Sequence, residues 1–338
     1  MLHYLFLLLE LFSQGRAPID SSRVGVTNSA QQCKGCHQDE YKEWRSSRHS
    51  MAWTNDFFQL DYQKNKRQWC RNCHIPLKAQ QQDDEVALRL RKEGINCITC
   101  HVRGDIFLAK VKRAKSPHNT QASADFGDDS FCAGCHQFNF PVFGQHGELA
   151  SYTNEPMQNT VEQFRQGPFA KSHTCRDCHT NTPGKHAYAG SHDLGMLQQA
   201  LTFDICRSGN QVTTTLTNTG AGHNVPTGDV HRHIVVRLWR STAPENLKQA
   251  FYGRRFKPLF TGGKTTIWNS SLPPNTYRRW QVDALKLGGE PSEDLNAEVR
   301  YLYGSRETYR PPFKEVPSRV IFRVRKALTE LTPCKSKK

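Results

Sequence analysis

Cys33-Lys-Gly-Cys36-His37 is the first of five closely similar stretches in this 338-residue chain. The other four are Cys70-Arg-Asn-Cys73-His74, Cys97-Ile-Thr-Cys100-His101, Cys132-Ala-Gly-Cys135-His136 and Cys175-Arg-Asp-Cys178-His179. A shuffled chain with the same 12 Cys and 15 His would contain about 0.02 such stretches. Five copies therefore indicate one chemical task that is repeated five times.

The Cys-x-x-Cys-His pattern is the attachment motif of c-type haem. Two thiols separated by two residues can bond to the two vinyl groups at one edge of a porphyrin, and the adjacent histidine then binds the iron as proximal ligand. A lone Cys-x-x-Cys pair would also suit a zinc site, a thiol redox pair or a disulfide. None of these needs a histidine at the same offset five times, so we predict five haem c groups, with the ten motif cysteines binding the cofactors and the five motif histidines binding iron.

Other histidines are candidates for the distal side of these irons, because many electron-transfer haems take a second axial ligand. Each candidate lies close to a motif or in a turn-rich segment, and the alternative for each is a structural or solvated histidine. The distal candidates are His49, His118, His186, His192 and His223. Bis-histidine ligation is the expected result.

The composition supports a cofactor-rich chain. Hydrophobic residues make up 36%, and the formal net charge is +15. These values exclude a polytopic membrane protein, and porphyrins can supply the apolar interior that side chains do not. Haem propionates would offset much of the positive charge. Lys and Arg are scattered along the chain rather than gathered in one stripe, so we expect no binding to nucleic acid.

Residues 1–15 are predicted to be a secretory signal peptide. Residues 1–12 read MLHYLFLLLELF, an apolar run well short of the about 20 residues that span a bilayer. Ser13 and Gly15 provide small residues for cleavage after Gly15. The alternatives are an uncleaved anchor or a wrongly assigned start of the chain. The expected location is periplasmic or extracellular.

The fold class expected is α+β, because the pattern changes near residue 200. Residues 16–199 read as a pentahaem domain of helix and coil, with about 29 residues per haem over the 147 that hold the motifs, so the haems must pack together. Residues 200–330 contain alternating apolar runs between Gly, Pro and Asn clusters, which predict an antiparallel β-sandwich, with an immunoglobulin-like topology as one option. Residues 331–338 form a basic tail. Cys206 and Cys334 can pair as a disulfide across this domain or remain two thiols.

The stretch from Cys33 to His37, followed by Trp44, His49 and Ala52, resembles the start of the tetrahaem cytochrome c five-five-four family. The next three motifs and His118 fall in similar order, so the resemblance covers about residues 30–140. It implies electron transfer by closely stacked haem pairs, with His118 on the first haem and His49 on a later one. The fifth motif and the β-domain depart from the family pattern.

The function expected is electron transfer along five covalently attached haems, with redox proteins as partners, such as other multihaem cytochromes or quinol-oxidising complexes. Two alternatives stay open. One is a haem enzyme that reduces or oxidises a small nitrogen or sulfur compound at a five-coordinate haem, for which the second motif is the best place. The other is a subunit of a polymeric cytochrome filament or a larger redox complex.

Overall fold

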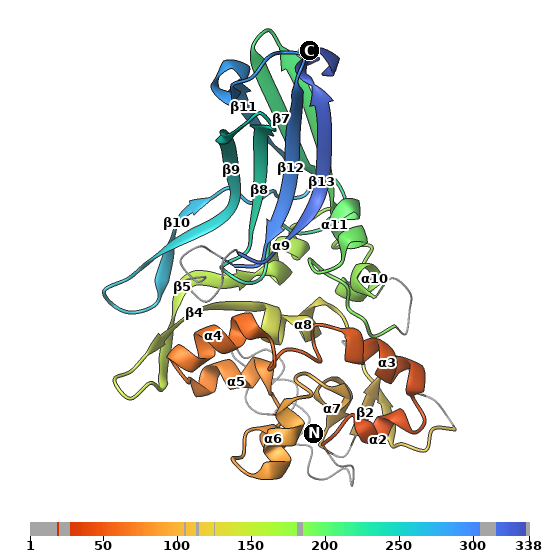
Figure 1. Ribbon diagram of the computed structural model, residues 1–338. Helices are drawn as coiled ribbons and strands as arrows, with labels where there is room; N and C mark the ends of the chain where they lie inside the picture. Colours follow the sequence, from red (N-terminus) through yellow and green to blue (C-terminus); the bar gives the residue numbers. More distant parts are fainter. Residues whose placement is uncertain are drawn as a thin grey trace. The chain divides into compact units, whose positions relative to one another are not determined.

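The computed structural model describes Ile19 and residues 28–104, 106–112, 115–124, 126–180, 185–304 and 316–335. The expected signal peptide, residues 1–15, lies outside these residues, as do residues 336–338 of the expected basic tail. The chain forms two compact units, whose elements are drawn in Figure 1. The motif unit comprises Met1–Met157, Lys171–Ala189 and Leu259–Gly263, and the sandwich unit comprises Gln158–Ala170, Gly190–Pro258 and Lys264–Lys338. Because the units interleave along the chain, the expected boundary near residue 200 stays a prediction.

The helices of the motif unit are short. They are α2 (Gln31–Lys34), α3 (Gln38–Ser46), α4 (Asp56–Lys64), α5 (Gln68–His74), η1 (Lys78–Gln80), α6 (Glu85–Arg91), α7 (Cys97–His101), α8 (Asp129–His136) and α10 (Cys175–His179). Side-chain caps fix several starts: Asn96 accepts hydrogen bonds from the amides of Ile98 and Thr99 at the start of α7, and Asp128 accepts from Phe131 at the start of α8. These caps fix the starts of the helices that carry the third and fourth motifs.

The motif unit also contains small sheets that the sequence pattern did not predict. One sheet has the order β1 (Val102–Arg103), β2 (Ile106–Ala109), β3 (Thr120–Ala122), and a second pairs β4 (Gln137–Phe143) with β5 (Leu149–Asn159). Within β4, Phe138 and Phe140 alternate toward the interior and are buried. The short strands after α7 and α8 escaped prediction because each begins directly after a motif histidine.

The sandwich unit consists of two antiparallel sheets. One has the order β11 (Tyr277–Asp283), β7 (Gln211–Asn218), β6 (Leu201–Ser208), and the other has the order β10 (Lys264–Asn269), β9 (Ala243–Pro258), β8 (His233–Arg240), β12 (Asp294–Leu302), β13 (Ser318–Ala327). The smaller elements of this unit are α9 (Thr160–Arg165), α11 (Leu194–Ala200), η2 (Ala284–Leu287) and η3 (Leu328–Glu330). In the first sheet β7 lies between its neighbours as strand B lies between A and E in an immunoglobulin fold, and β9, β8, β12 and β13 follow the order C′, C, F, G. The expected α+β class and the β-sandwich are confirmed.

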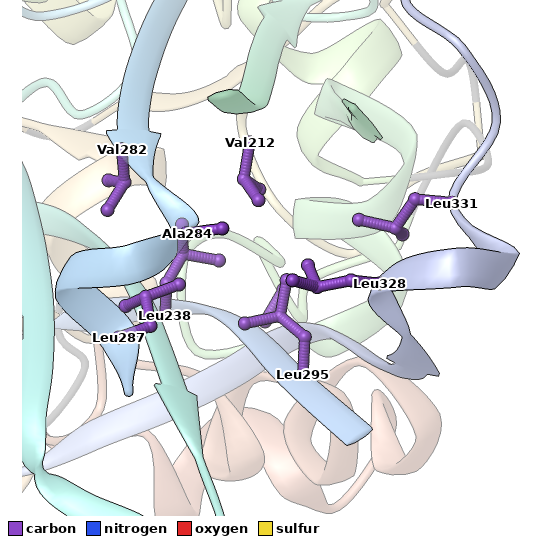
Figure 2. Packing of buried hydrophobic residues seen from close by; sticks show 9 residues of the cluster. Val212, Leu238, Val282, Ala284, Leu287, Leu295, Leu328 and Leu331 are labelled. Atoms are coloured by element: carbon purple, nitrogen blue, oxygen red, sulfur yellow. The ribbon is translucent and has the colours of Figure 1, made fainter. Parts of the chain in front are cut away.

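Apolar side chains from both sheets meet in the core of the sandwich (Figure 2). Val212 and Val282 come from the three-stranded sheet, and Leu238 and Leu295 come from the five-stranded sheet. Leu287 and Leu328, from the two 3₁₀ turns, pack against the same cluster. The core therefore forms by the ordinary burial of alternating strand residues.

A disulfide joins Cys206 in β6 to Cys334, which decides between the two alternatives that the sequence left open. It links the first strand of the sandwich to the segment after the last, and the Arg207 amide hydrogen-bonds the Thr332 carbonyl beside it. In the part of the chain that the structure describes, none of the helices is long and apolar enough to cross a membrane.

Candidate haem-binding site

The five motifs share one local conformation. Four occupy helical turns that end at the motif histidine, in α5, α7, α8 and α10. In the first motif, α2 covers Cys33 and the His37 amide hydrogen-bonds the Cys33 carbonyl at 2.9 Å, which continues the turn. Residues i, i+3 and i+4 share one helix face, so each turn presents two thiols and one imidazole to the same side. This arrangement suits attachment to one porphyrin edge.

None of the ten motif cysteines forms a disulfide, whereas Cys206 and Cys334 are bonded to each other. The motif cysteines therefore remain chemically suited to thioether bonds.

Three motif histidines have their Nδ1 atoms held by backbone carbonyls. His74 Nδ1 lies 2.7 Å from Ala52 O, His101 Nδ1 lies 3.0 Å from Leu108 O, and His179 Nδ1 lies 2.6 Å from Ala189 O. A carbonyl only accepts, so each Nδ1 donates its proton and Nε2 carries the lone pair. Metal-binding histidines usually have this tautomer and this outer hydrogen bond. The motif histidines thus fit the role of iron ligands.

Three of the five distal candidates face a motif histidine. The ring centroids are separated by 6.4 Å for His37 and His118, 6.3 Å for His49 and His136, and 6.2 Å for His101 and His186. Two imidazoles bound to opposite sides of one iron, each with a bond of about 2 Å and a ring centre about 1.1 Å further out, would be separated by about 6 Å. All three pairs match this spacing, although their members are far apart in the sequence.

Burial lowers the pKa of two of these histidines. The pKa of His49 is lowered to about 4, first by burial and then by the nearby His136 and His179. The pKa of His101 is also lowered to about 4, where burial outweighs the opposing hydrogen bond to Leu108. Both rings are therefore neutral at physiological pH, which is the form that binds a metal.

Motifs that are distant in sequence lie side by side in the motif unit. The Cys97 thiol donates a hydrogen bond to Cys33, which brings the third motif next to the first. The Cys132 thiol donates to Cys175, which brings the fourth next to the fifth. The second motif lies close to the loop of His49. The Ala52 carbonyl accepts a hydrogen bond from His74 Nδ1, and the Ala52 amide donates one to His49 O at 3.1 Å.

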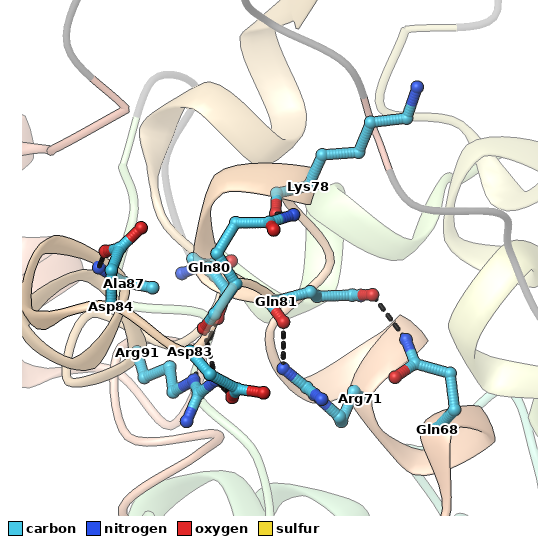
Figure 3. Close-up of polar contacts among 10 residues, drawn as sticks. Gln68, Arg71, Lys78, Gln80, Gln81, Asp83, Asp84, Ala87 and Arg91 are labelled. Atoms are coloured by element: carbon cyan, nitrogen blue, oxygen red, sulfur yellow. Dashed lines mark hydrogen bonds and ion pairs between the residues drawn. The ribbon is translucent and has the colours of Figure 1, made fainter.

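A polar network supports the helix of the second motif (Figure 3). Gln80 is fully buried and donates to the carbonyls of Leu90 and Gly94 at 3.1 and 2.8 Å. The neighbouring Gln81 accepts hydrogen bonds from Gln68 and Arg71 of α5 (Figure 3). The network joins α5 to α6 through η1, and so fixes the position of the turn that carries Cys70 to His74.

The other two distal candidates belong to the sandwich unit. The His192 ring stacks on Tyr303 with centroids 4.0 Å apart and an interplanar angle of 4°. His223 lies in the turn after β7, where its Nδ1 donates to Asn224 O at 2.9 Å. Both rings are held in defined orientations, and His223 has the same tautomer as His74, His101 and His179.

Comparison with known proteins agrees with this geometry. The family described as cytochrome c554 and c-prime matches residues 32–102, the stretch that contains the first three motifs. The protein is a multihaem c-type cytochrome. A comparison of this cytochrome with curated proteins finds no match. Among solved structures, it is similar to a penta-haem cytochrome c552 from Thermochromatium tepidum, with a TM-score of 0.65 and 18% identity over 88% of this chain and 98% of that one.

The match in structure shows that the cytochrome shares its fold with that protein. The predicted family resemblance and the haem c cofactor are confirmed, and electron transfer through haem is the general function of this cytochrome. Redox proteins are accordingly its general class of partner.

The Cys-x-x-Cys-His pattern gives no indication of several residues that surround the histidines. Phe107 stacks on His118 with ring centroids 4.4 Å apart, and Phe58 stacks on His74 with ring centroids 3.5 Å apart. The ring centroids of Tyr188 and His49 are separated by 4.9 Å. The carbonyls that hold the Nδ1 atoms were also unforeseen. Aromatic side chains and carbonyls occur throughout the chain, so no sequence signal distinguishes the ones that orient a ligand. Only the fold identifies the aromatic side chains and carbonyls that lie beside the histidines.

Proposed function

We propose that this cytochrome is an extracytoplasmic electron carrier in which all five motifs hold covalent haem c with bis-histidine ligation. The observation that carries the proposal is the set of three imidazole pairs with centroid separations of 6.2–6.4 Å. Bound haem would supply a one-electron iron couple at each motif. The ten thiols anchor the cofactors, and the paired imidazoles set the coordination of the iron.

In this proposal three distal ligands are paired with motif histidines. His118 binds the iron opposite His37, and His186 binds the iron opposite His101. His49 binds the iron opposite His136. His192 and His223 are also proposed as distal ligands, without assignment to a particular motif. The defined orientation of the His192 ring and the tautomer of His223 support this role.

The contacts between motifs suggest an order for electron transfer. The Cys33–Cys97 contact supports a step between the first and third motifs, and the Cys132–Cys175 contact supports a step between the fourth and fifth. The Ala52 contacts with His74 and His49 support a branch from the second motif to the fourth. We propose that the electron path follows these contacts rather than the order of motifs in the sequence.

The proposed location is periplasmic or extracellular, supported by the signal-like residues 1–15 and by the export that haem attachment requires. The proposed partners are other multihaem cytochromes or quinol-oxidising complexes. Assembly into filaments is the alternative, and electron microscopy of the purified protein over a range of concentrations tests it: monomers at every concentration would exclude it.

Mass spectrometry and electron paramagnetic resonance of the oxidised holoprotein test the proposal together. Five haem additions of about 0.6 kDa each are expected, with low-spin signals throughout. Replacement His118→Ala should convert one iron to a high-spin state. The matched control is His146→Ala, which removes an exposed histidine of the same unit and should change no signal.

Fewer than five haem additions would contradict the proposed haem number, and a His118→Ala spectrum identical to the native one would contradict the proposed ligation. A stable high-spin signal in the native protein would instead favour the enzyme alternative. Turnover of hydroxylamine or a nitrogen or sulfur oxyanion would then establish it.

A further inference from the structure

Tyr188 lies between two of the histidine pairs. Its ring contacts the His49 ring with centroids 4.9 Å apart at 57°, and the His186 ring with centroids 6.5 Å apart at 82°. His49 faces His136 of the fourth motif, and His186 faces His101 of the third. One phenol ring therefore touches the candidate distal ligands of two different irons.

The backbone of Tyr188 is in the left-handed region, with φ of 46°. A bulky residue at such an angle is strained relative to an ordinary conformation, and persists when the surrounding structure holds it there. Glycine would adopt this angle without that strain. The tyrosine at this position places an aromatic ring where glycine would place none.

Contacts on both sides of Tyr188 hold the segment in place. The His186 amide donates to Glu43 Oε2 of α3 at 2.8 Å, and the Ala189 carbonyl accepts from His179 Nδ1 of the fifth motif at 2.6 Å. The ring thus projects from a segment that is fixed at both ends. Its position against His49 and His186 follows from these anchors.

We propose that Tyr188 is a positioning residue shared by the distal ligands of the third and fourth motifs, whose ring sets the rotation of both imidazoles about their bonds to iron. The proposal rests on the bis-histidine ligation proposed above. Outer contacts that orient a ligand tune the electronic state and the potential of the metal. A single change at Tyr188 should therefore alter two haems together.

Three variants test this role by electron paramagnetic resonance and potentiometric titration of the holoprotein. Tyr188→Gly removes the ring and suits the backbone angle, so it should shift two of the low-spin signals and the two corresponding midpoint potentials. Tyr188→Phe keeps the ring and should leave the native signals in place. Asn275→Gly is the matched control, because Asn275 has φ of 57° in a turn of the sandwich unit and should affect none of them.

Tyr188→Asn, which also tolerates the left-handed region but lacks an aromatic ring, repeats the test if Tyr188→Gly does not mature. If Tyr188→Gly and Tyr188→Asn show the same low-spin signals as the native protein, this proposal is overturned and the proposed function stays intact. A shift of only one signal would overturn the shared role. Absence of bis-histidine signals in the native protein would instead refute the proposed function.

Discussion

The two units of this cytochrome form their interiors by different means. In the sandwich unit, strand residues such as Val212, Leu238 and Leu295 form an extended apolar cluster, and a disulfide closes the domain. In the motif unit, one described cluster of buried residues contains Leu77, Ile98 and Val102, and the side chain of Cys33 packs against it. Haem would supply the rest of that interior. The difference shows that one chain can combine a core of side chains with a core that depends on its cofactors.

The largest effect should follow from preventing haem attachment. Protein produced without haem should lose the protected structure of residues 28–157, because the porphyrins provide much of the apolar interior there. Strands β7, β8 and β12 should stay protected, since their core contains only side chains. Hydrogen exchange measured by peptide provides the test. Equal protection of both units without haem would contradict the comparison.

Removal of the disulfide should affect the sandwich alone. The double change Cys206→Ala and Cys334→Ala opens a loop with a sequence separation of 128 residues. Its loss should lower the free energy of unfolding by about 4–5 kcal/mol in the chain-entropy model. Urea unfolding followed by circular dichroism measures this change, and the haem count should stay native. A lower haem count would show that the two units are not energetically separate.

Gly94 tests how tightly the loop of His49 is packed. Gly94 has φ of 55°, and an added Cβ would lie 2.6 Å from His49 O. Gly94→Ala should lower the free energy of unfolding by about 1–3 kcal/mol and shift the resonance signal of one iron. Gly104→Ala is the matched control, because Gly104 has φ of 59° and nothing within 4 Å of an added Cβ. Equal spectra for the two variants would argue against the role of His49.

The smallest effect concerns an ion-pair network on β12. Burial raises the pKa of Glu298, but hydrogen bonds from Arg300 and Arg323 outweigh it, so the pKa lies below the usual 4.5. The carboxylate therefore stabilises the sandwich above the unfolded-state pKa, and this contribution is lost as the pH falls through the folded-state value.

Glu298→Gln should accordingly weaken the sandwich at pH 7 and reduce its acid sensitivity below about pH 4.5. Asp294→Asn is the control, because its pair with Arg325 is largely exposed and should contribute little. Urea midpoints measured across the pH range provide the comparison. Identical pH profiles for Glu298→Gln and the native protein would contradict the prediction.

Local patterns account for some elements. The Asp84 side chain caps α6 by accepting a hydrogen bond from the Ala87 amide at 2.8 Å, and Gly94 follows the end of that helix. The strand pattern after residue 200 predicted the sandwich. The β4–β5 pair departs from the helix and coil expected for residues 16–199, and β4 begins directly after the motif residue His136.

The sequence by itself determined the covalent chemistry. Each Cys-x-x-Cys-His motif fits within one helical turn, where the chain geometry already brings two thiols and an imidazole to one side. The tertiary structure decided which histidine faces which motif. His118 meets His37 and His49 meets His136 only because long-range packing brings separate segments together. The same packing placed Tyr188 between two candidate ligands, a relation that no local spacing could reveal.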